Sequence, residues 1–74
     1  MILLTGRDTG LPAYIFEKEI VRIEEMKEQV RVRSHPFTRV FLQDEKSGYE
    51  YFLDVKEKKK EIEKMLEEEK RKHG

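Results

Sequence analysis

The sequence predicts a mainly β protein of the α+β class, with a small antiparallel sheet, curled into an SH3-like or partial barrel, and one C-terminal helix. Residues 49–55 place Tyr49, Tyr51, Leu53 and Val55 at alternate positions, which is the period of a strand. Apolar residues then recur at helical spacing at positions 62, 65 and 66, within a run of Glu and Lys. Short β-branched and aliphatic runs upstream predict the remaining strands.

The N-terminal third predicts two strands and one segment of mixed character. Residues 2–5 and 12–16 are expected to be strands, because GRDTG between them has the composition of a turn and Pro12 suits the first position of a strand. Residues 19–26 fit a short helix or a strand. We favour a strand, because β-branched residues dominate there.

The middle of the chain predicts three further strands. Lys27 and Glu28 are expected to form a turn before a strand at residues 29–33. Pro36 is expected to end regular pairing across residues 34–37. A hairpin should follow, with strands at residues 38–43 and 49 to about 56 around a DEKSG loop.

Two starts of the helix compete. Asp54 and Glu57 have capping-box spacing, which would start the helix at Val55. We favour a start near residue 58, because Val55 continues the strand alternation. The chain then forms one domain over residues 1–66, with the sheet within 2–56, the helix over about 58–70 and a charged, fraying tail at 67–74. The expected helix-docking core consists of Ile62, Met65, Leu66, Tyr49, Tyr51 and Leu53.

Charge dominates the composition. Of the 74 residues, 43% are charged, yet 16 basic and 16 acidic residues balance to zero, which excludes a uniformly polyanion-binding surface. The enrichment in Glu and Lys fits a heat-loving source as well as a long exposed helix. The apolar run at residues 1–4 is too short for a signal peptide, and no segment could span a membrane. We therefore expect a cytoplasmic protein.

No motif predicts catalysis. Asp8-Thr9-Gly10 is the tripeptide of aspartic proteases, but here it lies in a Gly-rich turn, where Asp is ordinary. His35 and His73 lack further ligands at metal-binding spacing, and the chain has no Cys. We expect a protein that is not an enzyme and needs no cofactor, metal or small-molecule substrate.

Two interaction faces follow from the strand alternation. Phe41 and Phe52 should lie opposite the core, where a second subunit could cover them, unless sheet curvature turns both faces inward. We expect a homo-oligomer or a protein partner, and hence a small protein–protein interaction or assembly module. The alternative is a small barrel that binds RNA or single-stranded nucleic acid through Arg31, Arg33 and Arg39 beside Phe37, unless these arginines only solubilise the sheet.

The outline also resembles the FlbD-like family of small flagellar and swarming-motility proteins. The matching residues are Met1 to Thr5, Gly10, Ile20, Ile23 to Glu25, Gly48, Tyr51, Val55 to Glu57, Glu61 and Ile62. The resemblance implies a motility role, although similar outlines occur in small phage and uncharacterised bacterial proteins. This chain departs from the family by inserting QVRVRSHPFTRV and by carrying Lys58 to Lys60 before the helix. The opening strand and final helix are also similar to the carbon-storage-regulator type of RNA binder, whose Gly-rich body is missing here.

Overall fold

The computed structural model describes the backbone of residues 1–73 and the side chains of residues 1–72. Its elements are β1 (Ile2–Thr5), β2 (Pro12–Ile15), the 3-10 turn η1 (Glu17–Glu19), β3 (Ile20–Val30), β4 (Arg33–Gln43), β5 (Glu50–Val55) and α1 (Lys59–His73). Of the predicted tail, Gly74 lies outside the described residues.

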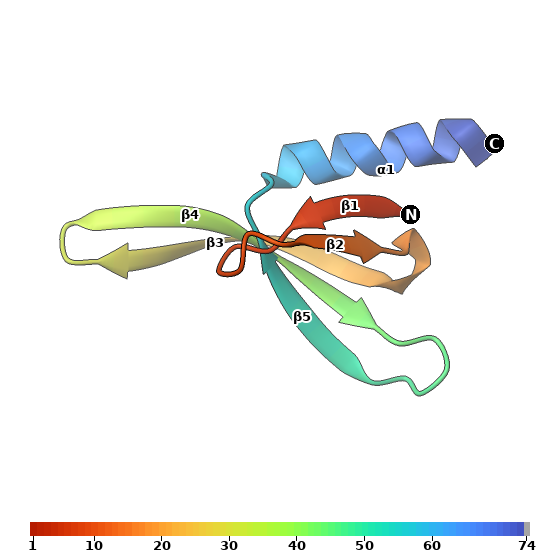
Figure 1. Cartoon of the computed structure of the whole chain (residues 1–74), viewed down its shortest axis with the longest axis horizontal. Coiled ribbons are helices and arrows are strands. Elements are labelled where there is room, and N and C mark those ends of the chain that lie inside the picture. The colour runs from red at the N-terminus through yellow and green to blue at the C-terminus, as the bar shows by residue number, and fades with distance from the viewer. Residues whose placement is uncertain (74) are drawn as a thin grey trace.

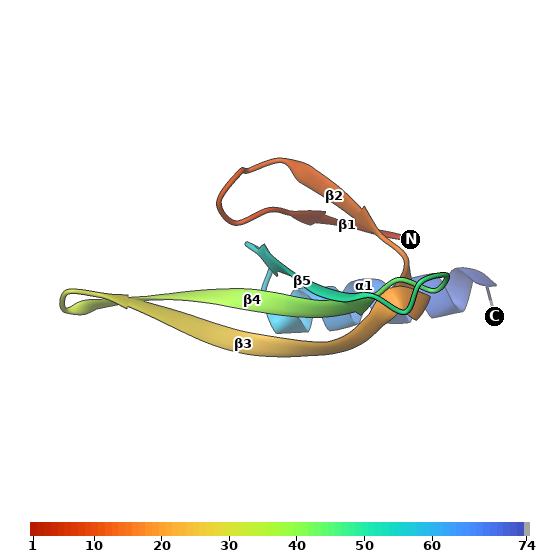
Figure 2. The same cartoon turned by 90° about the horizontal axis from the view of Figure 1, so that it is seen from below.

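The strands form two antiparallel sheets, one with the order β1-β2 and one with the order β3-β4-β5 (Figure 1). The predicted mainly β, α+β class with a C-terminal helix is confirmed. Within residues 1–73 the two sheets do not close into a barrel. The β1-β2 sheet lies to one side of the three-stranded sheet, as the view from below shows (Figure 2).

The β3–β4 hairpin is longer than the sequence predicts. β3 continues through Lys27 and Glu28, and the chain turns at Arg31 and Val32 instead, where Arg31 adopts a φ of 59°. Since β5 pairs with β4 only from Thr38 onward, residues 26–37 form a two-stranded projection, called here the β-arm. The arm extends away from α1 and the β1-β2 sheet (Figure 1). The predicted turn at residues 27–28 and the predicted break at residues 34–37 are therefore wrong.

Pro36 is compatible with the arm because its missing N–H faces the open side of β4. The backbone groups of Asp54 and Lys56 form hydrogen bonds toward β1. The backbone N–H and C=O of Val55, which lies between them, therefore face β4. Val55 pairs with Thr38, and by strand alternation Thr38 and Pro36 both direct their backbone groups toward the β5 side. β5 does not extend as far as Pro36, and no ladder hydrogen bond is lost.

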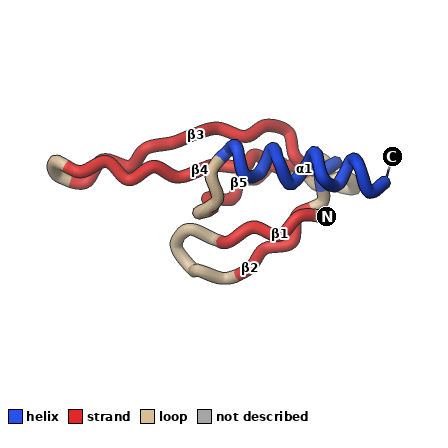
Figure 3. Tube along the Cα trace, turned by 90° about the horizontal axis from the view of Figure 1, so that it is seen from above, coloured by secondary structure: helices blue, strands red, loops and turns tan. Residues whose placement is uncertain are grey.

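The core lies between the β1-β2 sheet, the inner face of β4 and β5, and the first turns of α1. Its buried side chains are Ile2, Leu4, Ile15, Val40, Leu42, Val55 and Ile62, with Leu53, Met65 and Leu66 partly buried against them. α1 contacts β1 and β3, and it crosses over the sheet in the view from above (Figure 3). The helix begins at Lys59, close to the predicted start near residue 58, so the alternative start at Val55 is wrong.

A short junction joins the two sheets. The N–H of Lys56 donates to the C=O of Thr5 at 2.9 Å, and Gly6 bridges to Val55. Glu57 accepts hydrogen bonds from the Thr5 N–H at 2.7 Å and the Thr5 hydroxyl at 2.8 Å, so both carboxylate oxygens are used. Gly6 suits its own turn, because a Cβ there would lie 2.5 Å from the Thr9 hydroxyl oxygen. The junction therefore fixes the connection from β5 to α1 against β1.

We predict that Glu57→Ala lowers the free energy of unfolding by about 2 kcal/mol, because it removes two hydrogen bonds to a carboxylate. Urea denaturation followed by circular dichroism measures the change. Glu63→Ala, an exposed glutamate on α1, is the control and should change the value by less than about 0.5 kcal/mol. Equal effects of the two substitutions would show that the junction does not depend on the Glu57 carboxylate.

Candidate interaction surfaces

The outer face of the three-stranded sheet carries the two phenylalanines that the sequence proposes for self-association. Phe41 and Phe52 are direct cross-strand neighbours, with ring centroids 6.3 Å apart. Val40 and Leu42, which flank Phe41, are buried, so the two rings lie on the side opposite the core. Phe52 remains 54% exposed, whereas Phe41 is half-buried.

Arginine side chains cover these rings within the chain itself. The guanidinium carbon of Arg22 lies 4.0 Å from the ring centroid of Phe41, and that of Arg39 lies 4.2 Å from the centroid of Phe52. These cation–π contacts place a charged group over each ring that would otherwise meet a partner. We call this surface the arginine–aromatic face, and its members are Arg7, Arg22, Arg39, Phe37, Phe41 and Phe52.

Arg39 is further fixed by a cross-strand ion pair. Its Nε donates to Asp54 Oδ1 at 2.8 Å and its Nη2 donates to Asp54 Oδ2 at 3.2 Å, which is the two-pronged geometry that suits guanidinium and carboxylate. The hydrogen bond to Asp54 raises the pKa of Arg39 above its ordinary value. Arg39 is thus committed to its own chain.

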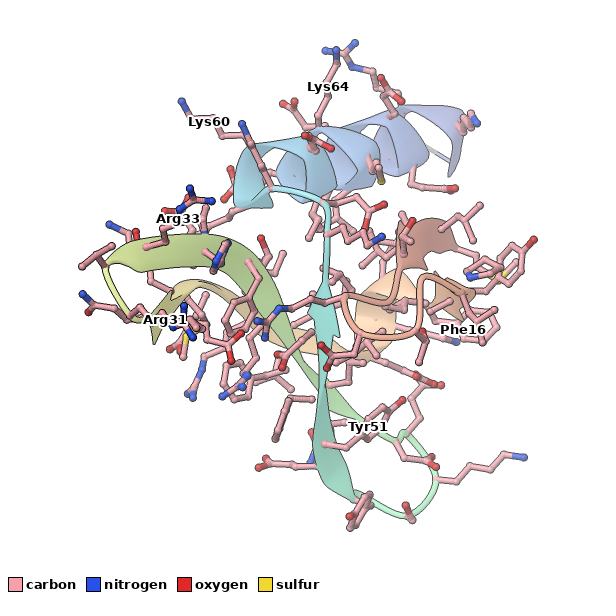
Figure 4. The ribbon with its side chains drawn as sticks, turned by 60° about the vertical axis from the view of Figure 1, so that its left-hand side comes forward. Phe16, Arg31, Arg33, Tyr51, Lys60 and Lys64 are labelled. Atoms are coloured by element: carbon pink, nitrogen blue, oxygen red, sulfur yellow. The ribbon has the colours of Figure 1, made fainter. Side chains whose placement is uncertain are left out.

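The arginine-rich site proposed for nucleic acid is not assembled as the sequence predicts. Arg31 lies in the turn of the β-arm and Arg33 begins β4, so they do not share one strand face. Arg39 is paired with Asp54, and Phe37 is covered by Arg7, whose guanidinium carbon lies 4.1 Å from the ring centroid. Figure 4 shows Arg31 and Arg33 at the end of the arm.

We predict that Arg39→Lys lowers the urea midpoint more than Arg71→Lys, an exposed arginine on α1. Lysine keeps the charge but loses both the two-pronged contact with Asp54 and the flat stacking on Phe52. Combining Arg39→Lys with Asp54→Asn in a double-mutant cycle should give a smaller loss than the sum of the single losses. Strict additivity would contradict the pairing.

Tyr49 and Tyr51 lie outside the core, contrary to their expected role beneath the helix. Their rings stack at a centroid distance of 6.2 Å, and both are exposed, Tyr49 at 69%. The sequence alternation gives their shared face correctly, but β5 extends beyond the region that α1 covers. Partial burial, with the negative charges of Glu19 and Asp44, raises the pKa of Tyr51 above its ordinary value of 10.0.

We predict that Tyr51 ionises above pH 10.0 in the folded protein. Because the folded-state pKa exceeds the unfolded value, the stabilising contribution is complete below the unfolded pKa and disappears as the pH rises through the folded one. The absorbance titration of phenolate in the wild type minus that in Tyr51→Phe isolates this group. Glu19→Gln should move the difference titration to lower pH. A difference titration with the same midpoint in urea-unfolded protein would contradict the shift.

The outward face of the β1–β2 hairpin is an apolar surface that the sequence prediction missed. Leu3 and Tyr14 are direct cross-strand partners and are 47% and 66% exposed, while their neighbours Ile2 and Ile15 are buried. Met1 and Phe16 continue the same alternation, and both are exposed. We call this surface the hairpin face. The signal was present in the sequence, since every position from 1 to 4 is apolar and both faces of such a strand must be apolar.

A second missed feature is a groove of about 510 Å³ between the base of the β-arm and the start of α1. It is called here the lysine groove, and its lining residues are Glu25, Met26, Lys27, Pro36, Phe37, Thr38, Lys56, Lys58, Lys59 and Lys60. The basic run near residue 58 is visible in the sequence. Lys27 is distant in the chain, and only the continuous β3 brings it to this groove.

The remaining candidate residues do not gather into a site. Asp8 is exposed in the β1–β2 turn, where the Thr9 hydroxyl accepts a hydrogen bond from the N–H of Leu11. His35 lies on β4 in the arm, and the His73 side chain is outside the described ones. Across residues 1–72, no three His, Asp or Glu side chains lie where they could hold a metal ion. No helix within residues 1–73 is long and apolar enough to cross a membrane.

Comparisons with known proteins give this chain no family: no family model, no curated protein and no solved structure matches it.

Proposed function

We propose that this protein is a non-enzymatic interaction and assembly module that self-associates through the hairpin face. The observation that carries the proposal is the exposed pair Leu3 and Tyr14, flanked by Met1 and Phe16. Adjacent exposed apolar side chains on one face of a hairpin are typical of a surface that a partner covers. The resemblance to FlbD-like proteins extends this proposal to a motility assembly, and the similar outlines of small phage proteins extend it to a phage assembly.

A second copy of the chain is the proposed partner. Within the described residues, the fold exposes eleven large hydrophobic side chains and buries only seven, so a lone chain leaves much apolar surface in water. The net charge is zero, so two copies do not repel each other as highly charged proteins do. A two-fold contact would place the Leu3–Tyr14 pair of each copy against that of the other, because such an interface uses one patch twice.

The hairpin face supports this contact better than the predicted Phe41–Phe52 pair or a strand edge. Phe41 and Phe52 already stack against arginines of the same chain. The open edge of β3 carries Glu25 and Lys27, and the open side of β4 carries Pro36, which are typical of edges that avoid pairing.

We further infer that the two sheets belong to an open, partial-barrel arrangement. The Gly6–Val55 bridge supports this, because it connects β1 to β5 and so places all the strands on one continuous path, from β2 through β1, β5 and β4 to β3. The hairpin face would then form part of the outside of this partial barrel.

We predict that the wild-type protein associates with rising concentration and that Leu3→Ser combined with Tyr14→Ser raises the dissociation constant roughly 10- to 100-fold, as expected for losing two central apolar contacts. Sedimentation velocity over a concentration series measures the association. Circular dichroism verifies that each variant is folded.

Two matched variants make the test specific. Val32→Ser removes an apolar side chain that is 95% exposed at the tip of the β-arm, and it should leave association unchanged. Phe52→Ser tests the face proposed from the sequence. If Phe52→Ser disrupts association and the Leu3/Tyr14 variant does not, the contact lies on the arginine–aromatic face. A wild-type protein that stays monomeric throughout would overturn self-association.

A further inference from the structure

The lysine groove concentrates positive charge at one place on a chain of zero net charge. Five lysines line it: Lys27, Lys56, Lys58, Lys59 and Lys60. Glu25 is the single acidic residue in the lining. The lysines come from β3, from the connection after β5 and from the first turn of α1, so three parts of the fold supply them.

None of these five lysines forms an ion pair with an acidic group among residues 1–72. Glu57 is their direct sequence neighbour, but both of its carboxylate oxygens accept hydrogen bonds from Thr5. The Glu57 carboxylate is thus oriented toward β1, and Glu25 is the acidic residue that remains in the lining. Like charges held together in this way repel one another, and a bound anion would relieve the repulsion.

The lining has the chemistry to bind phosphate groups. Lysine binds phosphate as a compact point charge, without the two-pronged geometry of arginine. The lining contains lysines and no arginine, while Arg7 and Arg39 are engaged on the arginine–aromatic face. Competition by polyglutamate distinguishes a strand of phosphates from an acidic peptide.

The groove also provides apolar surface beside the charges. Pro36 belongs to its lining, and such a group can contact the flat face of a base or a sugar, whereas the ring of Phe37 is covered by Arg7. Its volume of about 510 Å³ lies within the range of roughly 300–1,000 Å³ that is usual for sites that enclose small molecules or parts of larger ones.

The positive charge continues beyond the groove along the β-arm. Arg31 and Arg33 lie at the end of the arm, and Lys60 extends from the start of α1 toward the same side in Figure 4. Neither arginine forms an ion pair with an acidic group within residues 1–72. A single small anion would occupy the groove alone, whereas a chain of phosphates could follow the charges from the groove onto the arm.

We propose that the lysine groove binds the phosphodiester backbone of single-stranded nucleic acid, with the strand continuing along the β-arm. This site uses different residues from the hairpin face, so it stands independently of the proposed self-association. The phosphates contact Lys27, Lys56 and Lys60, and a base or sugar lies against Pro36.

The test measures fluorescence anisotropy of a labelled oligothymidylate of about 16 nucleotides, the upper end of what a small β domain covers. We expect affinity to fall steeply with salt, with a slope of about −0.7 for each phosphate contacted. Lys56→Gln combined with Lys60→Gln should weaken binding roughly 10- to 100-fold at low salt and reduce the slope by about 1.4.

The matched control is Lys64→Gln combined with Lys70→Gln. Both lysines are exposed on α1 outside the groove, and the pair removes the same charge, so binding should change less than about twofold. Lys27→Gln tests whether binding needs the folded groove or only the basic run from Lys58 to Lys60. It should weaken binding as well, because only the folded arm brings Lys27 to the site.

Several outcomes would overturn the proposal. These are no binding at low salt, an equal loss in the control pair, an unchanged affinity in Lys27→Gln, and a polyglutamate that competes as well as the oligonucleotide at equal charge. A thymidine monophosphate that binds as tightly as the oligonucleotide would also overturn it, because it would limit the site to a small phosphate. Sedimentation of the Lys56/Lys60 variant should match that of the wild type, which distinguishes this site from the hairpin face.

Discussion

The junction between Thr5–Arg7 and Asp54–Glu57 is the contact on which the rest of the structure depends. Each sheet alone is too small to bury its apolar face, and the β1-β2 sheet is only a two-stranded hairpin. The backbone hydrogen bonds of Thr5, Arg7 and Lys56 attach β1 to β5. The Glu57 carboxylate adds hydrogen bonds from the Thr5 N–H and the Thr5 hydroxyl. The core side chains Leu4 and Val55 are then brought from the two sheets into one cluster.

The same junction determines where the functional surfaces lie. Because Glu57 is held against β1, the chain leaves β5 and enters α1 with Lys58 to Lys60 beside the base of the β-arm. Because Ile2 and Leu4 face the core, Leu3 must face outward with Tyr14. The lysine groove and the hairpin face are thus two consequences of one attachment.

The sequence was sufficient for the elements whose period is unbroken. The alternation from Tyr49 to Val55 and the spacing of Ile62, Met65 and Leu66 predicted β5 and α1 close to their observed bounds. The β-arm could not be predicted by the same reasoning. A Lys-Glu pair and a proline are ordinary signals of turns, and only the limited length of β5 makes Pro36 harmless within β4.

The candidate sites likewise divide into features that strand alternation predicts and features that it does not. Strand alternation correctly placed Phe41 and Phe52 opposite the core, because that follows from local geometry. It could not show that Arg22 and Arg39 cover them, since Arg22 comes from another strand whose register is set by a bulge near residue 21. Tyr49 was misplaced for a related reason: the period of a strand gives the face, but not how far the helix reaches along it.

A net charge of zero restricts what the protein can bind less than it first suggests. It excludes a uniformly basic surface, but it does not prevent the fold from separating its charges. The Glu57 carboxylate is held by Thr5 and the Asp54 carboxylate by Arg39, so neither forms an ion pair with a groove lysine. The lysines of the groove are then left facing one another. The hydrogen bonds that stabilise this small domain therefore also determine which carboxylates are available to pair with the groove lysines.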